Sequence, residues 1–144
     1  MSFTILVIDD DDALLDLFRL LLDEEGYAVV TSKTAFEDVS EVERINPHLI
    51  ILDIMMGRHY EGLLLLEKLR LYPPTRSLPV ILCTAAANVI REQEETLQQK
   101  GVPILYKPFE LEELLQVIHS LLPGTGEKAE GGQENSGSDK GKVR

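Results

Sequence analysis

The sequence predicts an α/β domain built on a doubly wound parallel sheet. Short apolar runs, rich in β-branched residues, alternate with longer segments whose apolar residues recur at helical spacing. Glycine and proline residues separate these segments. Four of the apolar runs lead into a polar residue, which is typical of buried parallel strands whose carboxyl ends reach solvent.

Five strands are expected, because five short runs are rich in valine, isoleucine and leucine and are bounded by polar or turn-forming residues. They are Thr4–Ile8, Ala28–Thr31, Leu49–Asp53, Val80–Thr84 and Ile104–Tyr106. Strands that alternate with helices form βαβ units, which join parallel neighbours.

The first helix is expected over residues 12–25. Asp11 or Asp12 can cap its amino end through a side-chain oxygen, and Gly26 ends it. The apolar residues at helical spacing are Leu14, Leu17, Phe18, Leu21 and Leu22.

The next two helices are expected over residues 35–45 and 61–72. Each ends where a proline follows, at the Asn46-Pro47 pair and at the Pro73-Pro74 pair, because a residue before proline disfavours helical backbone. Their apolar positions are Phe36, Val39, Val42 and Ile45, and then Leu63, Leu66, Leu69 and Leu71.

The fourth helix is expected over residues 88–100, with Gly101 at its end, and the fifth over 111–122. The fourth is mostly polar, with Val89, Ile90 and Leu97 as its apolar anchors. The fifth carries Leu111, Leu114, Leu115, Ile118 and Leu122 on one side.

Composition and charge restrict the function further. A chain of 144 residues is long enough for one domain with an internal core. Its net charge of −11 disfavours direct binding to DNA, because neutralising phosphates needs clustered lysine and arginine. The single cysteine, Cys83, excludes an internal disulfide and is expected as a small core residue. We expect no signal peptide and no membrane span, since no apolar stretch approaches ~20 residues.

The composition changes after Pro123. Residues 123–144 are rich in glycine, serine, glutamate and lysine and contain almost no apolar residues. Such a segment cannot offset the entropy of ordering by burying apolar surface. We therefore expect a folded domain over residues 1–122 and a flexible tail or linker over 123–144.

The polar residues at the strand ends form the candidate site. Asp9 to Asp12 follow the first strand, Asp53 and Thr84 end the third and fourth strands, and Lys107 follows the fifth. Open parallel sheets bind ligands at the carboxyl edge, where these ends meet. Carboxylates, a hydroxyl and an ammonium gathered there can hold a divalent cation beside a phosphorylatable oxygen.

These residues belong to four motifs, ILVIDDDD, LIILDIMM, PVILCTAA and YKPF. In this order they make residues 3–122 resemble the receiver domain of bacterial two-component response regulators. The resemblance implies a flavodoxin-like sheet of order 2-1-3-4-5 flanked by five helices. It also implies that a phosphoryl group passes from a kinase phosphohistidine to an aspartate.

By position, Asp53 resembles the phosphoacceptor of this family. Asp9 and Asp10 resemble the acidic pair that binds Mg²⁺, with Asp10 as the direct ligand and Asp9 acting through water. Asp53 and the backbone carbonyl of Met55 are the further metal ligands that the resemblance implies. The family's switch hydroxyl, the small residue beside its acceptor and its lysine correspond to Thr84, Ala85 and Lys107. The family usually holds the bond between that lysine and the following proline in cis.

Two departures from the family pattern are visible. The family usually has a proline four residues after the acceptor and then an acid-glycine pair. Here position 57 is glycine and the Glu61-Gly62 pair falls one residue late, so the loop 57–61 is expected to be longer and less rigid. The aromatic residue that often precedes the lysine by three positions is replaced by Ile104.

Three functions fit this sequence. The first is a stand-alone phosphoacceptor receiver, which catalyses only its own phosphoryl transfer and hydrolysis. The second is a pseudo-receiver that binds a partner without phosphoryl turnover, although the intact acidic, threonine and lysine residues disfavour it. The third is an aspartyl-phosphate phosphatase, which usually needs a second acid where this chain has Met55. Glycine-rich phosphate loops are absent from the sequence, which disfavours a nucleotide hydrolase.

The expected partners follow from the resemblance. They are a sensor histidine kinase or phosphotransfer protein, a downstream protein target and, as a further candidate, a second copy of the chain in a homodimer. We expect Mg²⁺ as the cofactor, a cytoplasmic location, and no direct contact with nucleic acid or membrane.

Overall fold

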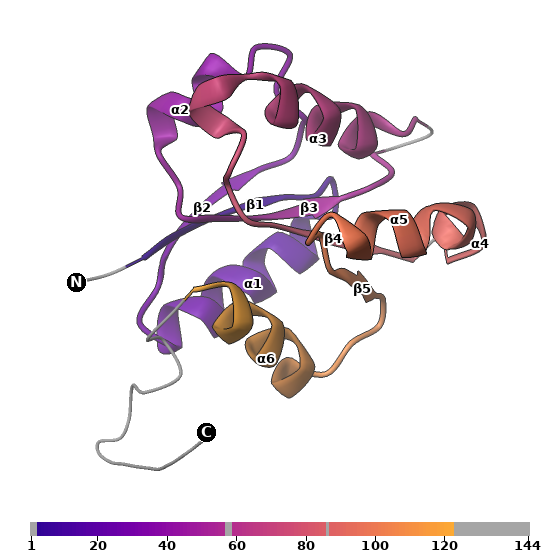
Figure 1. Ribbon diagram of the computed structural model, residues 1–144. Coiled ribbons are helices and arrows are strands. Elements are labelled where there is room, and N and C mark those ends of the chain that lie inside the picture. Colours follow the sequence, from indigo (N-terminus) through magenta and orange to yellow (C-terminus); the bar gives the residue numbers. More distant parts are fainter. Residues whose placement is uncertain (1–2, 57–58, 86, 123–144) are drawn as a thin grey trace, which may run out of the picture. The chain divides into compact units, whose positions relative to one another are not determined.

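The structure is a computed structural model that describes residues 3–56, 59–85 and 87–122. Its first unit, Met1–Phe109, contains a five-stranded parallel sheet of order β2-β1-β3-β4-β5 (Figure 1). The second unit, Glu110–Arg144, contains α6 at Leu111–Leu121. The predicted fold class and strand order are confirmed. The predicted tail, 123–144, lies outside the described residues.

The strand boundaries agree closely with the predicted ones. The strands are β1 (Thr4–Ile8), β2 (Ala28–Ser32), β3 (Leu49–Asp53), β4 (Val80–Thr84) and β5 (Ile104–Tyr106), so only β2 is one residue longer than predicted. Every residue of β3 and β4 is buried, whereas the edge strand β2 has none. Burial on both faces explains why the central strands are continuously apolar rather than alternating.

Helices cover both faces of the sheet in the first unit. Figure 1 shows α1 (Asp12–Glu24) on one face and α2 (Ser40–Ile45) and α3 (Glu61–Leu71) on the other. A short 3-10 helix, η1 (Pro73–Thr75), follows α3 at the predicted proline pair.

The first helix is capped as predicted, but its apolar face was only partly predicted. Asp11 accepts hydrogen bonds from the backbone N–H groups of Ala13 and Leu14, at 3.0 and 3.3 Å. The buried residues are Leu15, Phe18 and Leu22, whereas Leu17, one of the apolar residues at helical spacing, is 48% exposed. Leucines are so frequent here that several helical stripes fit the sequence, and packing against the sheet selects one of them.

The second helix is shorter than the predicted range of 35–45. It begins at Ser40, because the side chain of Asp38 accepts a 2.9 Å hydrogen bond from the Ser40 backbone N–H and forms a turn instead. Phe36 and Val39 still pack against the core, from outside the helix. The predicted stop is confirmed, since Asn46 adopts a left-handed φ of 56°.

The predicted helix over 88–100 is broken into three pieces. They are α4 (Ala87–Ile90), the 3-10 helix η2 (Arg91–Gln93) and α5 (Glu94–Gln99). Ile90 and Leu97 are buried, but η2 between them has no buried residue. Packing therefore anchors the segment at its two ends only, and its middle turn lacks the tertiary contacts that favour regular α-helix.

The α5 segment packs on the same core cluster as α3. That cluster contains Leu65, Leu66 and Leu69 of α3 together with Ile90 and Leu97. No helix within the described ranges is both long and apolar enough to span a bilayer.

Candidate functional site

Adjacent strands place three polar side chains at one edge of the sheet. Asp9 directly follows β1, and Asp53 and Thr84 are the last residues of β3 and β4. The register pairs Asp53 with Cys83, so the ends of β3 and β4 lie nearly level. The exposed fractions are 2% for Asp9, 7% for Asp53 and 1% for Thr84. The edge therefore holds two carboxyl groups that are nearly removed from solvent.

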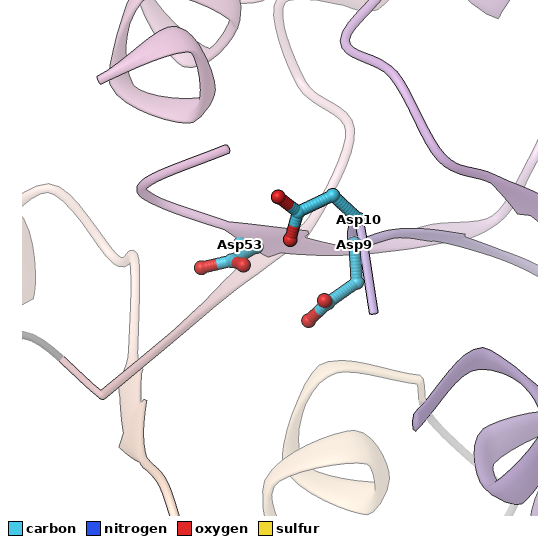
Figure 2. Close-up of side chains that lie close together, drawn as sticks. All are labelled: Asp9, Asp10 and Asp53. Atoms are coloured by element: carbon cyan, nitrogen blue, oxygen red, sulfur yellow. The ribbon is translucent and has the colours of Figure 1, made fainter. Parts of the chain in front are cut away.

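A third carboxylate completes an acidic cluster (Figure 2). Oxygen atoms of Asp9, Asp10 and Asp53 lie within 4.8 Å of one another. One oxygen of Asp9 accepts a 3.0 Å hydrogen bond from the backbone N–H of Asp11, whereas Asp10 is exposed. Asp9 is thus oriented by the main chain, and Asp10 faces solvent beside it.

Lys107 supplies the cation of the site. Its Nζ donates to Asp9 Oδ2 at 2.8 Å and to Asp53 Oδ2 at 3.4 Å. Its backbone N–H donates to the Thr84 carbonyl at 2.8 Å, which fixes the chain where it leaves β5. The Lys107-Pro108 bond is cis, as the resemblance implied. The lysine therefore spans the ends of both acidic strands.

Burial controls the protonation of the acceptor candidate. Desolvation raises the pKa of Asp53 to about 6, and the negative charge of Asp9 adds to this effect. The Lys107 charge and the backbone N–H of Met55, 3.3 Å from Asp53 Oδ1, oppose it. Burial lowers the pKa of Lys107, but its hydrogen bond to Asp9 and the two carboxylate charges outweigh burial and raise that pKa overall. At neutral pH the pKa of Asp53 therefore leaves this side chain mostly ionised, and the raised pKa of Lys107 keeps its ammonium charged.

The donor set fits a hard divalent cation. Three carboxylates face one ammonium, so the ionised cluster keeps two uncompensated negative charges. Mg²⁺ prefers carboxylate oxygens and usually retains several waters, and exposed Asp10 leaves room for them. A dication would balance the remaining charge of the cluster.

The remaining predicted site residues lie around Asp53 and the end of β4. Thr84 is buried, and Ala85, which follows it, is exposed. Met55 is half-buried and contacts Asp53 through its backbone N–H. The switch role of Thr84, the role of Ala85 and the Met55 carbonyl ligand stay predictions.

Gly62 is a site residue whose role the sequence analysis missed. A Cβ atom built on it would collide with the carbonyl oxygen of Asp53 and would lie 2.8 Å from the Cα of Ile54. Its backbone N–H donates to the Ile54 carbonyl at 3.0 Å, so the start of α3 is pressed against the end of β3. The Glu61-Gly62 pair was the signal that could have revealed this close approach.

The loop after Asp53 and the position of Ile104 are the two departures from the family pattern. Residues 57 and 58 of the predicted longer loop lie outside the described part, and Met56 and His59 on either side form an antiparallel bridge. Ile104 and Tyr106 both pack on the same core cluster, as their shared strand parity predicts. The Tyr106 hydroxyl donates to Glu94 Oε1 at 2.6 Å, which links β5 to α5.

Cys83 is buried in the sheet next to Thr84. It is 1% exposed, and burial raises the pKa of its thiol to about 12. It is the small core residue that the sequence predicts.

Comparisons with known proteins agree with this geometry. The family model of the response regulator receiver domain matches residues 5–119. A solved response regulator receiver domain protein (CheY-like) from Methanospirillum hungatei is 30% identical, with a TM-score of 0.71, and the match covers 90% of this chain and 100% of that one. The chain belongs to the response regulator receiver domain family. It is therefore a receiver domain of a two-component signalling protein.

Two relatives differ in how much of their length is matched. The probable transcriptional regulatory protein TcrX of Mycobacterium tuberculosis is 32% identical over 85% of this chain, but only 51% of that protein is covered. An uncharacterized 14.6 kDa protein of Leptolyngbya boryana is 33% identical, with 79% of this chain and 86% of that protein covered. The chain thus spans about half the length of the first of these relatives and most of the second.

Proposed function

We propose that this receiver domain accepts a phosphoryl group on Asp53 and thereby changes a surface that binds a partner protein. The observation that supports this most directly is the acidic cluster of Asp9, Asp10 and Asp53 with Lys107 across it. An acceptor carboxylate, two further carboxylates and a mobile cation are the groups that phosphoryl transfer to an aspartate needs.

The transfer step uses the ionised form of Asp53. A carboxylate oxygen attacks phosphorus of a phosphohistidine while the bond between phosphorus and the imidazole nitrogen breaks, and the imidazole leaves with that electron pair. The product is an acyl phosphate on Asp53. Hydrolysis later breaks the bond between phosphorus and the Asp53 oxygen, and water supplies the oxygen that leaves with phosphate.

Charge is the main obstacle to this reaction, since Asp9 and Asp10 repel an incoming phosphoryl group. Bound Mg²⁺ would supply the positive charge that offsets this repulsion and stabilises the equatorial oxygens. Asp10, Asp9, Asp53 and the backbone carbonyl of Met55 are the proposed ligands. Lys107 adds a point charge that can follow a phosphoryl oxygen.

Phosphorylation would then rearrange the end of β4. The new phosphoryl oxygens can accept hydrogen bonds from the Thr84 hydroxyl and the Lys107 ammonium, which draws both groups toward Asp53. Ala85 leaves room for the phosphoryl group beside the acceptor. The α4 to α5 segment follows this strand end directly, so it is the part that a downstream protein would read.

The proposed donor is a sensor histidine kinase or phosphotransfer protein in the cytoplasm. The relative TcrX is named as a transcriptional regulatory protein. The proposal that nucleic acid is not bound directly therefore concerns this receiver domain alone. A pseudo-receiver that binds partners without phosphoryl turnover is the alternative, and the complete set of site residues disfavours it.

Incubation with phosphoramidate separates these two functions. With Mg²⁺ present, the intact mass of the protein should increase by one phosphoryl group, and EDTA should prevent the increase. No increase at any Mg²⁺ concentration, with the fold intact, would favour the pseudo-receiver.

A further inference from the structure

A groove lies between α3 and the segment formed by η2 and α5, away from the acidic cluster. Its volume is about 840 Å³. Leu66, Leu97 and Val102 line it as buried members of the core cluster, and Leu63 lines it as a half-buried residue. Leu71 lies on its edge and is 78% exposed, the largest exposed fraction among the large hydrophobic residues of the described chain. Half-buried Leu63 lines the same groove, so Leu71 is part of an apolar edge, and contiguous apolar surface is typical of protein interaction sites.

Three cations line the same groove, which is unusual in a chain of net charge −11. They are Arg70, Arg76 and Lys100, and within the described residues none of them forms an ion pair. Glu67 and Glu92 also line the groove, so its lining carries a net positive charge of one. The groove is therefore apolar and weakly cationic on a strongly acidic domain.

The cations gather at one end. Helices α3 and α5 both return from the carboxyl edge of the sheet to the amino edge, so their carboxyl ends point the same way. Arg70 lies in the last turn of α3, and Lys100 directly follows α5. The cationic end therefore lies away from Asp53, whereas Glu92 lies toward the opposite end.

Arg70 is held in place without a counter-charge. Its Nη1 donates to the backbone carbonyls of Arg76 and Leu78, at 3.2 and 2.8 Å. Arg70 is half-buried, so its guanidinium is partly removed from water, and this burial lowers its pKa. A partly desolvated, oriented guanidinium with only carbonyl partners is well prepared to pair with a carboxylate.

We propose that this groove docks an amphipathic helix of a partner protein that carries acidic residues at one end. Its apolar side chains would pack on Leu63 and Leu71, as a helix does in a groove between two helices. Its carboxylates would lie against Arg70, Arg76 and Lys100. The inference does not depend on phosphorylation of Asp53.

The test is a titration of the unphosphorylated full chain with a synthetic amphipathic peptide, followed by amide and methyl NMR shifts. The peptide carries leucines at helical spacing and glutamates in its first turn, and a control peptide has lysines in place of the glutamates. Saturable shifts confined to the groove residues are expected for the glutamate peptide, with binding weakened at least about tenfold for the lysine peptide.

Variants of exposed groove residues locate the contact. The double variant Arg76→Glu, Lys100→Glu should weaken binding at least about tenfold, and so should Leu71→Glu. Arg44→Glu, which changes an exposed cation on α2, is the matched control and should leave the affinity unchanged. Melting curves must show that every variant remains folded.

Three results would overturn the proposal. They are equal affinity for both peptides, shifts that map outside the groove, or unchanged affinity in the double variant and in Leu71→Glu. Sedimentation without peptide tests whether a second copy of the chain occupies the groove. Self-association that the double variant abolishes would mean that a second copy of the chain fills the groove instead.

Discussion

The Lys107 ammonium lies closer to Asp9 than to Asp53, at 2.8 Å from the first carboxylate and 3.4 Å from the second. In the unphosphorylated domain, the Lys107 ammonium therefore pairs mainly with Asp9, which is also a proposed metal ligand. Under the proposed function, phosphoryl transfer would draw the lysine from Asp9 toward the new phosphoryl oxygens. We therefore predict that Asp9 both pairs with Lys107 and helps to bind the metal.

Substitutions of the two aspartates should separate those tasks. Asp10→Asn should weaken Mg²⁺ binding with little effect on metal-free stability, because Asp10 is exposed. Asp9→Asn should also lower metal-free stability, by about 1–3 kcal/mol, because Lys107 loses its nearest carboxylate. Mg²⁺-dependent shifts of the melting temperature report the first effect, and denaturant unfolding in EDTA reports the second. Equal metal-free stability of the two variants would contradict this division.

The raised pKa of Asp53 predicts a pH-dependent cost to stability. The folded-state pKa of about 6 lies above the ordinary value of 3.8, so the folded state binds more protons between these values. The ionised side chain should therefore destabilise the metal-free domain above pH 6 and have no such effect below pH 4.

Asp53→Asn should be more stable than the parent at pH 7 in EDTA, by about 1–3 kcal/mol, and this advantage should shrink toward pH 4. Denaturant unfolding of both proteins across this range measures it. If the stability advantage of Asp53→Asn grew as the pH falls, the pKa of Asp53 would be lowered by folding rather than raised.

The close approach at Gly62 predicts a severe effect of one methyl group. Gly62→Ala should lower stability by more than about 2 kcal/mol, because its Cβ meets the main chain of Asp53 and Ile54. Gly101→Ala is the control, because φ is +80° there but a Cβ built on Gly101 has no neighbouring atom within 4 Å. Backbone strain alone should therefore lower its stability by about 1–2 kcal/mol. Thermal melts of both variants compare them, and equal losses would mean that the contact at Gly62 relaxes easily.

We expect Tyr106 to transmit the change at the proposed switch residue, Thr84, from β5 to the α4 to α5 segment. Tyr106→Phe removes the hydroxyl that donates to Glu94, at a cost of about 1 kcal/mol or less. When beryllofluoride is added as a phosphoryl mimic, the resulting change in amide exchange over residues 87–99 should differ between Tyr106→Phe and the parent protein. Tyr72→Phe removes a bond of the same length, 2.6 Å, to Glu43 and is the matched control. Identical exchange changes in the two variants would rule out a special role for Tyr106.

The sequence predicted the features that depend on burial and strand polarity. The central strands were predicted correctly because β3 and β4 are continuously apolar until their last residues, Asp53 and Thr84. The positions of helices along the chain were also predicted, because Asn46 and Gly101 stop helices through backbone conformations that are local properties.

The errors arose where features other than the spacing of apolar residues decide the backbone conformation. The Asp38 side chain replaces the first turn of the predicted second helix, and the polar η2 turn interrupts the fourth. The Gly62 contact joins the start of α3 to the end of β3, and the Lys107 contact with Asp9 joins the ends of β5 and β1, so only the folded sheet reveals these distances. Motifs identify such residues, but they do not supply the geometry.

The most direct test is to locate the phosphoryl group chemically. The chain is incubated with phosphoramidate and Mg²⁺, reduced with borohydride, which converts an aspartyl phosphate to homoserine, and mapped by peptide mass spectrometry. We predict homoserine at position 53 alone, and none in EDTA or in Asp53→Asn. Modification of another aspartate, or labelling that persists in Asp53→Asn, would contradict the account.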